Sequence, residues 1–340
     1  MRNKSTYLIT IFMISFSILP AFSFEISHVK VGTSPWAVSV NPATDKIYVT
    51  NSGNDSVSVI DGKTNGVIKN IIVGENPTGV AVNKITNFIY VSKFSAPIVS
   101  VIDGNTNTVT ATIPVKTQPN GIGINEVTNQ VYVANTGAAS VSVIDGKTNT
   151  VTATIPVGAR PTAVSINPST NIAYVTNSGN DSVSIINVKT DSIIKTIPVG
   201  SGPTGIAINQ DTNQIYVSSS KTAQIFVING NTNTITGNVT VGPNPDGVSV
   251  NSNLGKVYVA NSGDGTISVI NMKTDTVSDI IPAGTHVYGI AVNPSTGTVY
   301  TGNDNPGIVY IISDSTELQT EDNGIVHNII QFFLHLFNFK

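Results

Sequence analysis

Residues 119–160 read PNGIGINEVTNQVYVANTGAASVSVIDGKTNTVTATIPVGAR, and residues 161–202 repeat the pattern as PTAVSINPSTNIAYVTNSGNDSVSIINVKTDSIIKTIPVGSG. The period of 42 residues continues through most of the chain without insertion or deletion. One tyrosine per unit keeps this spacing, at Tyr48, Tyr90, Tyr132, Tyr174, Tyr216, Tyr258 and Tyr300. An asparagine does the same, at Asn41, Asn83, Asn125, Asn167, Asn209, Asn251 and Asn293. A strict period of this length is typical of a repeat architecture.

Each unit contains four short segments that alternate or are rich in β-branched residues. In the unit at 119–160 these are residues 121–125, 130–134, 140–145 and 151–157. Asn, Asp, Gly and Thr fill the connections, as in tight hairpins. Four antiparallel strands per unit are typical of a propeller blade, whereas a parallel β-solenoid would use shorter coils. The sequence therefore predicts an all-β, seven-bladed β-propeller.

The position after the threonine of the first turn tolerates a positive φ in every unit, and we expect a left-handed residue there. Its occupants are Asp45, Asn87, Asn129, Asn171, Asn213, Gly255 and Gly297.

The ends of the repeat region predict how the ring closes. The last unit stops after its third strand, at residues 307–312, and residues 26–31 align with the outer strand at 67–73 one period later. We therefore expect the N-terminal strand to complete blade seven, which removes an unpaired sheet edge.

Segments outside the repeats predict export. Arg2 and Lys4 precede an apolar run, and Ala21-Phe22-Ser23 suits signal peptidase, so residues 1–23 are predicted to be a signal peptide cleaved after Ser23. An uncleaved anchor is the alternative, although the run is short for a span. The propeller is expected over residues 24–316 and a linker with an apolar helix over 317–340.

The tail segment Ile325–Phe339 has polar residues at helical spacing and a wide apolar face. It is too short to span a bilayer alone. Two interpretations stand: it docks on the propeller itself, or it attaches the chain to a membrane surface or a partner protein.

Composition excludes several kinds of site. The chain has no cysteine, so disulfides, thiolate metal sites and thiol nucleophiles are absent. The net charge of −3 disfavours nonspecific electrostatic binding to nucleic acid. Of the four histidines only His286 is placed near the channel, so no metal or catalytic triad is expected. We predict no cofactor.

The segments Tyr48-Val49-Thr50-Asn51 and Tyr174-Val175-Thr176-Asn177 resemble the signature of the YVTN β-propeller repeat family, with looser copies in other units. The resemblance covers residues 26–312. It implies an extracytoplasmic binding or structural role, as in archaeal surface-layer proteins and periplasmic YncE-like propellers, and carries no catalytic residues. The tyrosine and the asparagine of the YVTN motif recur in nearly every unit, so we expect them to be structural. The motif asparagine, as at Asn51, should tie the turn after its own strand, and the tyrosine should pack between blades.

A unique site is expected where equivalent positions differ. The residue after the repeated proline opens the innermost strand near the channel mouth, and it reads Trp36, Thr78, Asn120, Thr162, Thr204, Asp246 and Tyr288. Blades one and seven are neighbours in a closed ring, so Trp36, Tyr288 and His286 should lie together. Aromatic faces and amides suit a glycan, a protein or a small ligand. The alternative is that the two aromatic residues only fill space between blades one and seven, where the ring closes. The candidate ligand-binding residues are Trp36, Asp246, His286, Tyr288, Arg160 and Asn120.

Three further expectations concern function. The leading hypothesis is a noncatalytic cell-surface or periplasmic binding module. A lyase or hydrolase with its site at the channel mouth is the alternative, and a DNA-binding role through Lys93, Arg160 and Lys221 ranks last. Three sequons are candidates for glycosylation, at Asn54, Asn180 and Asn238.

Overall fold

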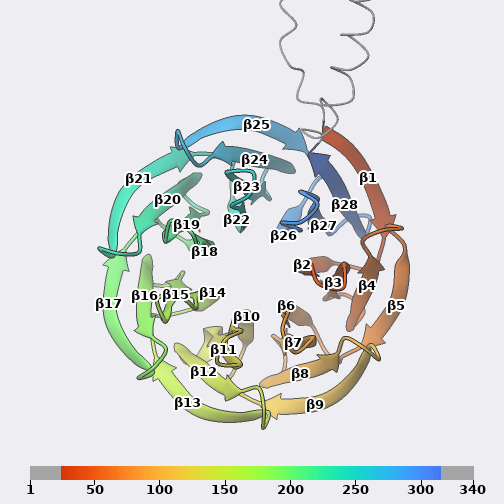
Figure 1. Cartoon of the computed structure of the whole chain (residues 1–340), viewed down its shortest axis with the longest axis horizontal. Coiled ribbons are helices and arrows are strands. Elements are labelled where there is room, and N and C mark those ends of the chain that lie inside the picture. The colour runs from red at the N-terminus through yellow and green to blue at the C-terminus, as the bar shows by residue number, and fades with distance from the viewer. Residues whose placement is uncertain (1–23, 315–340) are drawn as a thin grey trace, which may run out of the picture. The chain divides into compact units, whose positions relative to one another are not determined.

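The computed structural model of the chain describes residues 24–314. They form seven four-stranded antiparallel sheets around a central axis, a seven-bladed β-propeller (Figure 1). Residues 25–313 make one compact unit. The predicted leader at 1–23 and the tail segment Ile325–Phe339 lie outside the described residues. Among residues 24–314 there is no helix long and apolar enough to cross a membrane.

The first six blades each run along the chain from the innermost to the outermost strand. Their strands are β2 (Pro35–Asn41), β3 (Lys46–Asn51), β4 (Ser56–Asp61) and β5 (Val67–Ile72); β6 (Pro77–Asn83), β7 (Phe88–Lys93), β8 (Ile98–Asp103) and β9 (Thr108–Pro114); β10 (Pro119–Asn125), β11 (Gln130–Asn135), β12 (Ser140–Asp145) and β13 (Thr150–Pro156); β14 (Pro161–Asn167), β15 (Ile172–Asn177), β16 (Ser182–Asn187) and β17 (Ser192–Pro198); β18 (Pro203–Asn209), β19 (Gln214–Ser219), β20 (Gln224–Asn229) and β21 (Thr234–Thr240); β22 (Pro245–Asn251), β23 (Lys256–Asn261), β24 (Thr266–Asn271) and β25 (Thr276–Pro282). A short 3-10 helix, η1 (Thr136–Ala138), joins β11 to β12.

Blade seven combines both ends of the repeat region. Its strands are β26 (Val287–Val292), β27 (Val299–Asn303), β28 (Ile308–Asp314) and β1 (Phe24–Lys30). The sheet order β1-β28-β27-β26 places the first strand on the outside of the last blade (Figure 1). The Val31 N–H continues this pairing by donating to the Gly307 carbonyl at 3.0 Å. The predicted closure is confirmed.

The hairpin between the two inner strands of each blade turns through a left-handed residue, as predicted. All seven equivalents have a positive φ, from 51° at Asp45 to 74° at Gly297. At its other end the innermost strand carries a bulge, because Pro35 pairs with Asn51 but the next pair is Val38 with Val49. The bulge leaves Trp36 and its equivalents outside the regular ladder, at the channel.

The repeated tyrosines pack between blades, as expected. All seven have 1 % or less of their surface exposed. Tyr132 shares one core cluster with Val164, Ile166 and Val175 of the next blade. Its hydroxyl donates to the Val188 carbonyl at 3.2 Å and to the Asp191 carboxylate at 2.9 Å. Each tyrosine therefore adds apolar contact across a seam that no backbone hydrogen-bond ladder crosses.

The asparagine of the YVTN motif ties the turn after its own strand, which is also confirmed. In blade one, Asn51 Nδ2 donates to Ser56 Oγ at 3.1 Å and to Ser58 Oγ at 2.9 Å. The same pair of bonds recurs from Asn135, Asn177 and Asn261.

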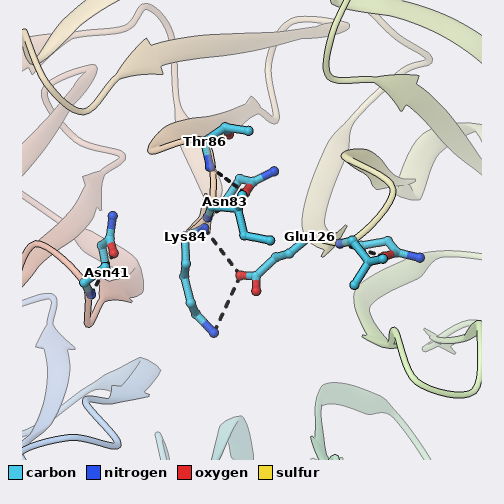
Figure 2. A network of polar contacts seen from close by, with 9 residues as sticks. Asn41, Asn83, Lys84, Thr86 and Glu126 are labelled. Carbon is cyan, nitrogen blue, oxygen red and sulfur yellow. Dashed lines mark hydrogen bonds and ion pairs between the residues drawn. The ribbon is translucent and has the colours of Figure 1, made fainter.

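In blades one, two, four and seven, the asparagine at the end of the innermost strand links its blade to the next, a role that the sequence did not reveal. Its side-chain oxygen accepts hydrogen bonds within its own turn, as Asn83 Oδ1 does from the Thr86 N–H at 3.1 Å (Figure 2). Its amide can donate to the left-handed residue of the next blade, as Asn83 Nδ2 does to Asn129 Oδ1 at 2.7 Å. Equivalent bonds start from Asn41, Asn167 and Asn293.

Candidate functional site

The channel has two mouths, and the face that bears Pro35 carries the variable residues. The loop that enters each innermost strand shares this face with the loop between the second and third strands. In blade one, the Ser52 N–H donates to the Ser34 carbonyl at 2.9 Å. The two loops therefore lie side by side on this face.

A cavity of about 260 Å³ occupies the channel at this mouth. It is lined by the seven residues that follow the proline position and by the small residue after each of them. Four blades contribute threonine or asparagine here, at Thr78, Asn120, Thr162 and Thr204. Blades six, seven and one are consecutive in the ring and contribute Asp246, Tyr288 and Trp36 instead. The wall therefore has one polar, repetitive side and one acidic, aromatic side.

Trp36 and Tyr288 stack on each other across the seam between blades one and seven. Their ring centroids are 4.4 Å apart and the ring planes differ by 18°. Trp36 keeps 36 % of its surface exposed. The prediction that these two aromatic residues meet is therefore confirmed, and together they present an aromatic surface at the channel mouth.

Close approach of the backbones holds this pair in place. Gly289 lies next to blade one, where an added Cβ would be 2.5 Å from the Trp36 carbonyl oxygen. Gly247 lies next to blade seven in the same way, and a Cβ added there would be 2.4 Å from the Tyr288 carbonyl oxygen. At these two positions a side chain would push the neighbouring innermost strand away.

Asp246 is the acidic residue of the cavity. Burial raises the pKa of its carboxyl to about 6, and a hydrogen bond from Thr204 opposes the rise. Part of the residue still faces the channel. The pKa of Tyr288 is also raised, by burial first and then by the negative charges of Asp304 and Asp246. The Tyr288 hydroxyl therefore lies in a field that two carboxylates make negative.

Hydroxyl groups on the second strands of several blades connect the innermost strands that line the cavity. Ser218 Oγ accepts the Gly205 N–H of its own blade at 2.7 Å and donates to the Asp246 carbonyl of the next blade at 2.6 Å. Thr50, Ser92 and Thr176 make the same double contact. The equivalent residues elsewhere are Ala134, Ala260 and Gly302, which have no hydroxyl. The bridge is thus missing at both seams beside Tyr288. The presence or absence of this hydroxyl could have been read from the sequence at the threonine position of the YVTN motif, but the sequence analysis did not predict its role.

Two other predicted site residues lie outside the cavity lining. His286 and Arg160 are on the exposed rim of the same face. Arg160 adopts a positive φ of 52°, a conformation shared by the residue before the proline in five other blades but not by His286. Of the six candidate ligand-binding residues, the structure brings four to the cavity, and these are Trp36, Asn120, Asp246 and Tyr288.

No three His, Cys, Asp or Glu side chains converge into a possible metal site within residues 24–314. Among the basic residues considered for DNA, Lys93 is only 9 % exposed, and burial lowers the pKa of its amine. It replaces the YVTN asparagine in blade two and is the last, buried residue of β7, so the expectation that it lies in a loop of this face is wrong. Asn54, Asn180 and Asn238 are exposed.

The opposite mouth holds a larger cavity, of about 480 Å³. Much of its wall is made of aliphatic residues from the innermost strands. Lys84 Nζ lies 3.6 Å from Glu126 Oε1, and the Lys84 N–H donates to the same oxygen at 3.4 Å (Figure 2). These two charges pair with each other, Asp211 adds a further carboxylate to the lining, and none of the described aromatic residues lines this mouth.

Comparison with known proteins supports the architecture. No family model matches the chain, and no curated protein matches it. A search of solved structures finds hydrazine synthase of Kuenenia stuttgartiensis, with a TM-score of 0.76 and 19 % sequence identity over 84 % of this chain and 97 % of that one. At this identity the likeness shows the fold alone: the chain is similar to other β-propellers in architecture.

Proposed function

We propose that this chain is a noncatalytic, extracytoplasmic binding module of the YVTN-propeller type, at the cell surface or in the periplasm. Its ligand occupies the channel mouth lined by Trp36, Asp246 and Tyr288. The observation that carries the proposal is that three consecutive blades depart from the threonine and asparagine of the other four, and that they do so at one cavity. The predicted signal peptide supports the location.

A binding role accounts for the aromatic pair better than a plug at the seam does. The pairing of β1 with β28 already ties the strand that leads into blade one to blade seven, and the hydrogen bond from Asn293 to Asp45 crosses the seam between the two blades. A residue needed only for packing would be buried like the repeated tyrosines, yet Trp36 is 36 % exposed. Exposed aromatic surface at a cavity is typical of ligand sites.

A binding screen of glycans and metabolites tests the proposal. Trp36→Ala and Tyr288→Ala should weaken a genuine ligand roughly tenfold or more, because each removes half of the aromatic surface. Lys84→Ala at the opposite mouth is the matched control and should bind normally. Thermal unfolding of every variant reports whether the ring stays folded. Undiminished binding by both aromatic variants would refute the site.

A lyase or hydrolase is the second candidate, and one observation favours it. A carboxyl with a pKa of about 6 beside a tyrosine hydroxyl has a proton affinity suited to acid–base catalysis. Chemical conversion of any compound that binds in the screen, abolished in Asp246→Asn, would support the enzyme and displace the binding module.

A further inference from the structure

We propose that the ligand of the channel mouth is a small organic cation, an amine or quaternary ammonium group held between the Asp246 carboxylate and the aromatic pair of Trp36 and Tyr288. This inference rests on the proposed function, since it concerns the same cavity, and it specifies the charge and size of the ligand.

The first reason is that the Asp246 carboxylate at the cavity has no positively charged side chain paired with it among the described residues. Within residues 24–314, no Lys or Arg nitrogen forms an ion pair with Asp246, whose hydrogen-bonding neighbour is Thr204. Asp304 adds a second negative charge near Tyr288. His286 and Arg160, on the rim, do not line the cavity. A partly buried carboxylate is costly when unpaired, so a positively charged ligand gains more here than in water.

The second reason is the order of the three residues around the ring. Tyr288 in blade seven lies between Asp246 in blade six and Trp36 in blade one. The stack turns one face of the Tyr288 ring toward Trp36. Asp246 lies in the blade on the other side of Tyr288, and its carboxylate is close enough to raise the pKa of the Tyr288 hydroxyl. A cation there would meet a carboxylate and an aromatic face together, and both attract positive charge.

The third reason is that the rest of the wall offers few free donors to a sugar or another polyol. Thr162 Oγ1 and Thr204 Oγ1 lie within hydrogen-bond distance of the carbonyls of Pro203 and Pro245, at 3.2 Å and 3.1 Å. Thr78 Oγ1 makes the equivalent, longer contact at 3.4 Å. With these hydroxyl protons engaged between blades, the donors left for a ligand rich in hydroxyls are Asn120, the Trp36 indole N–H and the Tyr288 hydroxyl. A cation needs no donor from the wall.

The cavity volume limits the size of the cation. Pockets for drug-sized molecules usually enclose about 300–1,000 Å³, and this one encloses about 260 Å³. The site therefore suits a small amine, or the ammonium end of a larger molecule whose remainder extends past Trp36 into solvent.

Calorimetric titration with charged and uncharged pairs tests the inference. The probes are choline against its carbon isostere dimethylbutanol, and butylamine against butanol, with the purified chain at neutral pH. At least one cation should bind roughly tenfold or more tightly than its neutral counterpart. Asp246→Asn should remove this preference, since the amide keeps the shape of the side chain and loses its charge. Trp36→Ala should weaken the cation, and Glu126→Gln at the opposite mouth is the matched control.

The outcomes separate this inference from the proposal beneath it. Equal binding of cation and isostere, no binding of either cation, or an unchanged preference in Asp246→Asn would each overturn the cationic ligand. A neutral sugar that binds and depends on Trp36 would overturn it too, while the binding module would stand. If no glycan, metabolite or cation depends on Trp36 or Tyr288, both proposals fail.

Discussion

Asn293 of blade seven donates from Nδ2 to Asp45 Oδ1 of blade one at 3.0 Å, across 248 positions of sequence. The bond repeats at the closure of the ring the contact that Asn41, Asn83 and Asn167 make with the blade after them. The ring is therefore closed twice, by strand pairing at its outer edge and by this side-chain bond near the channel.

Removing the acceptor of this bond should destabilise the ring. Asp45→Gly keeps the left-handed conformation and deletes the carboxylate, and it should cost about 1–3 kcal/mol in the free energy of unfolding. Asp45→Asn keeps an acceptor and should cost much less. Asn171→Gly is the matched control, because it occupies the same position but Asn125 Nδ2 has no hydrogen-bond partner among the described residues. Urea denaturation measures all three, and equal losses in Asp45→Gly and Asn171→Gly would contradict the closing role.

The repeated tyrosines should differ in what their hydroxyls contribute. Tyr132→Phe removes the bonds to Val188 and Asp191 and should cost about 1–2 kcal/mol. Tyr48→Phe should be neutral or slightly stabilising, because the Tyr48 hydroxyl is buried with no hydrogen-bond partner in the described chain. Both variants keep the aromatic ring, so the difference between their denaturation midpoints reports the hydroxyl alone. A larger loss from Tyr48→Phe than from Tyr132→Phe would be the opposite of this expectation.

The missing hydroxyl beside Tyr288 can be restored. Ala260→Ser places an Oγ where it can accept the Gly247 N–H and donate to the Tyr288 carbonyl, as Ser218 does one blade earlier. We expect a gain of about 1 kcal/mol in unfolding free energy. Ser218→Ala is the reciprocal variant and should lose a similar amount or more. The bridge is unimportant if the two substitutions leave the urea midpoint unchanged.

Asp246 should make stability fall as pH rises. Its pKa is raised from 3.8 to about 6 in the folded chain, so between these values the folded state binds more protons than the unfolded state. Stability is then lost from about pH 4 to pH 6 and stays lower above that range, by at most about 3 kcal/mol. Asp246→Asn removes this loss. The difference in unfolding free energy between variant and wild type, measured across this range, should grow with pH; a constant or shrinking difference would exclude a raised pKa.

Much of the site was predictable because the repeat assigns each residue an equivalent place. The proline position marked the start of the innermost strand, so Trp36, Asp246 and Tyr288 could be assigned to one mouth before any contact was known. His286 and Arg160 were drawn into the same prediction, yet their side chains lie on the exposed rim. Position along a strand predicts the face of the ring, whereas the direction of a loop side chain depends on the loop backbone.

The sequence by itself determined seven blades, the closure by the N-terminal strand, the left-handed turn residues and the buried tyrosines. These follow from a strict period because equal antiparallel sheets that each bury both faces must close on one another. Only the tertiary structure decided the hydroxyl bridges, the stacking of Trp36 on Tyr288 and the raised pKa of Asp246. These depend on distances between blades and on exclusion of water from the channel, and both are set when the ring closes rather than within any one repeat.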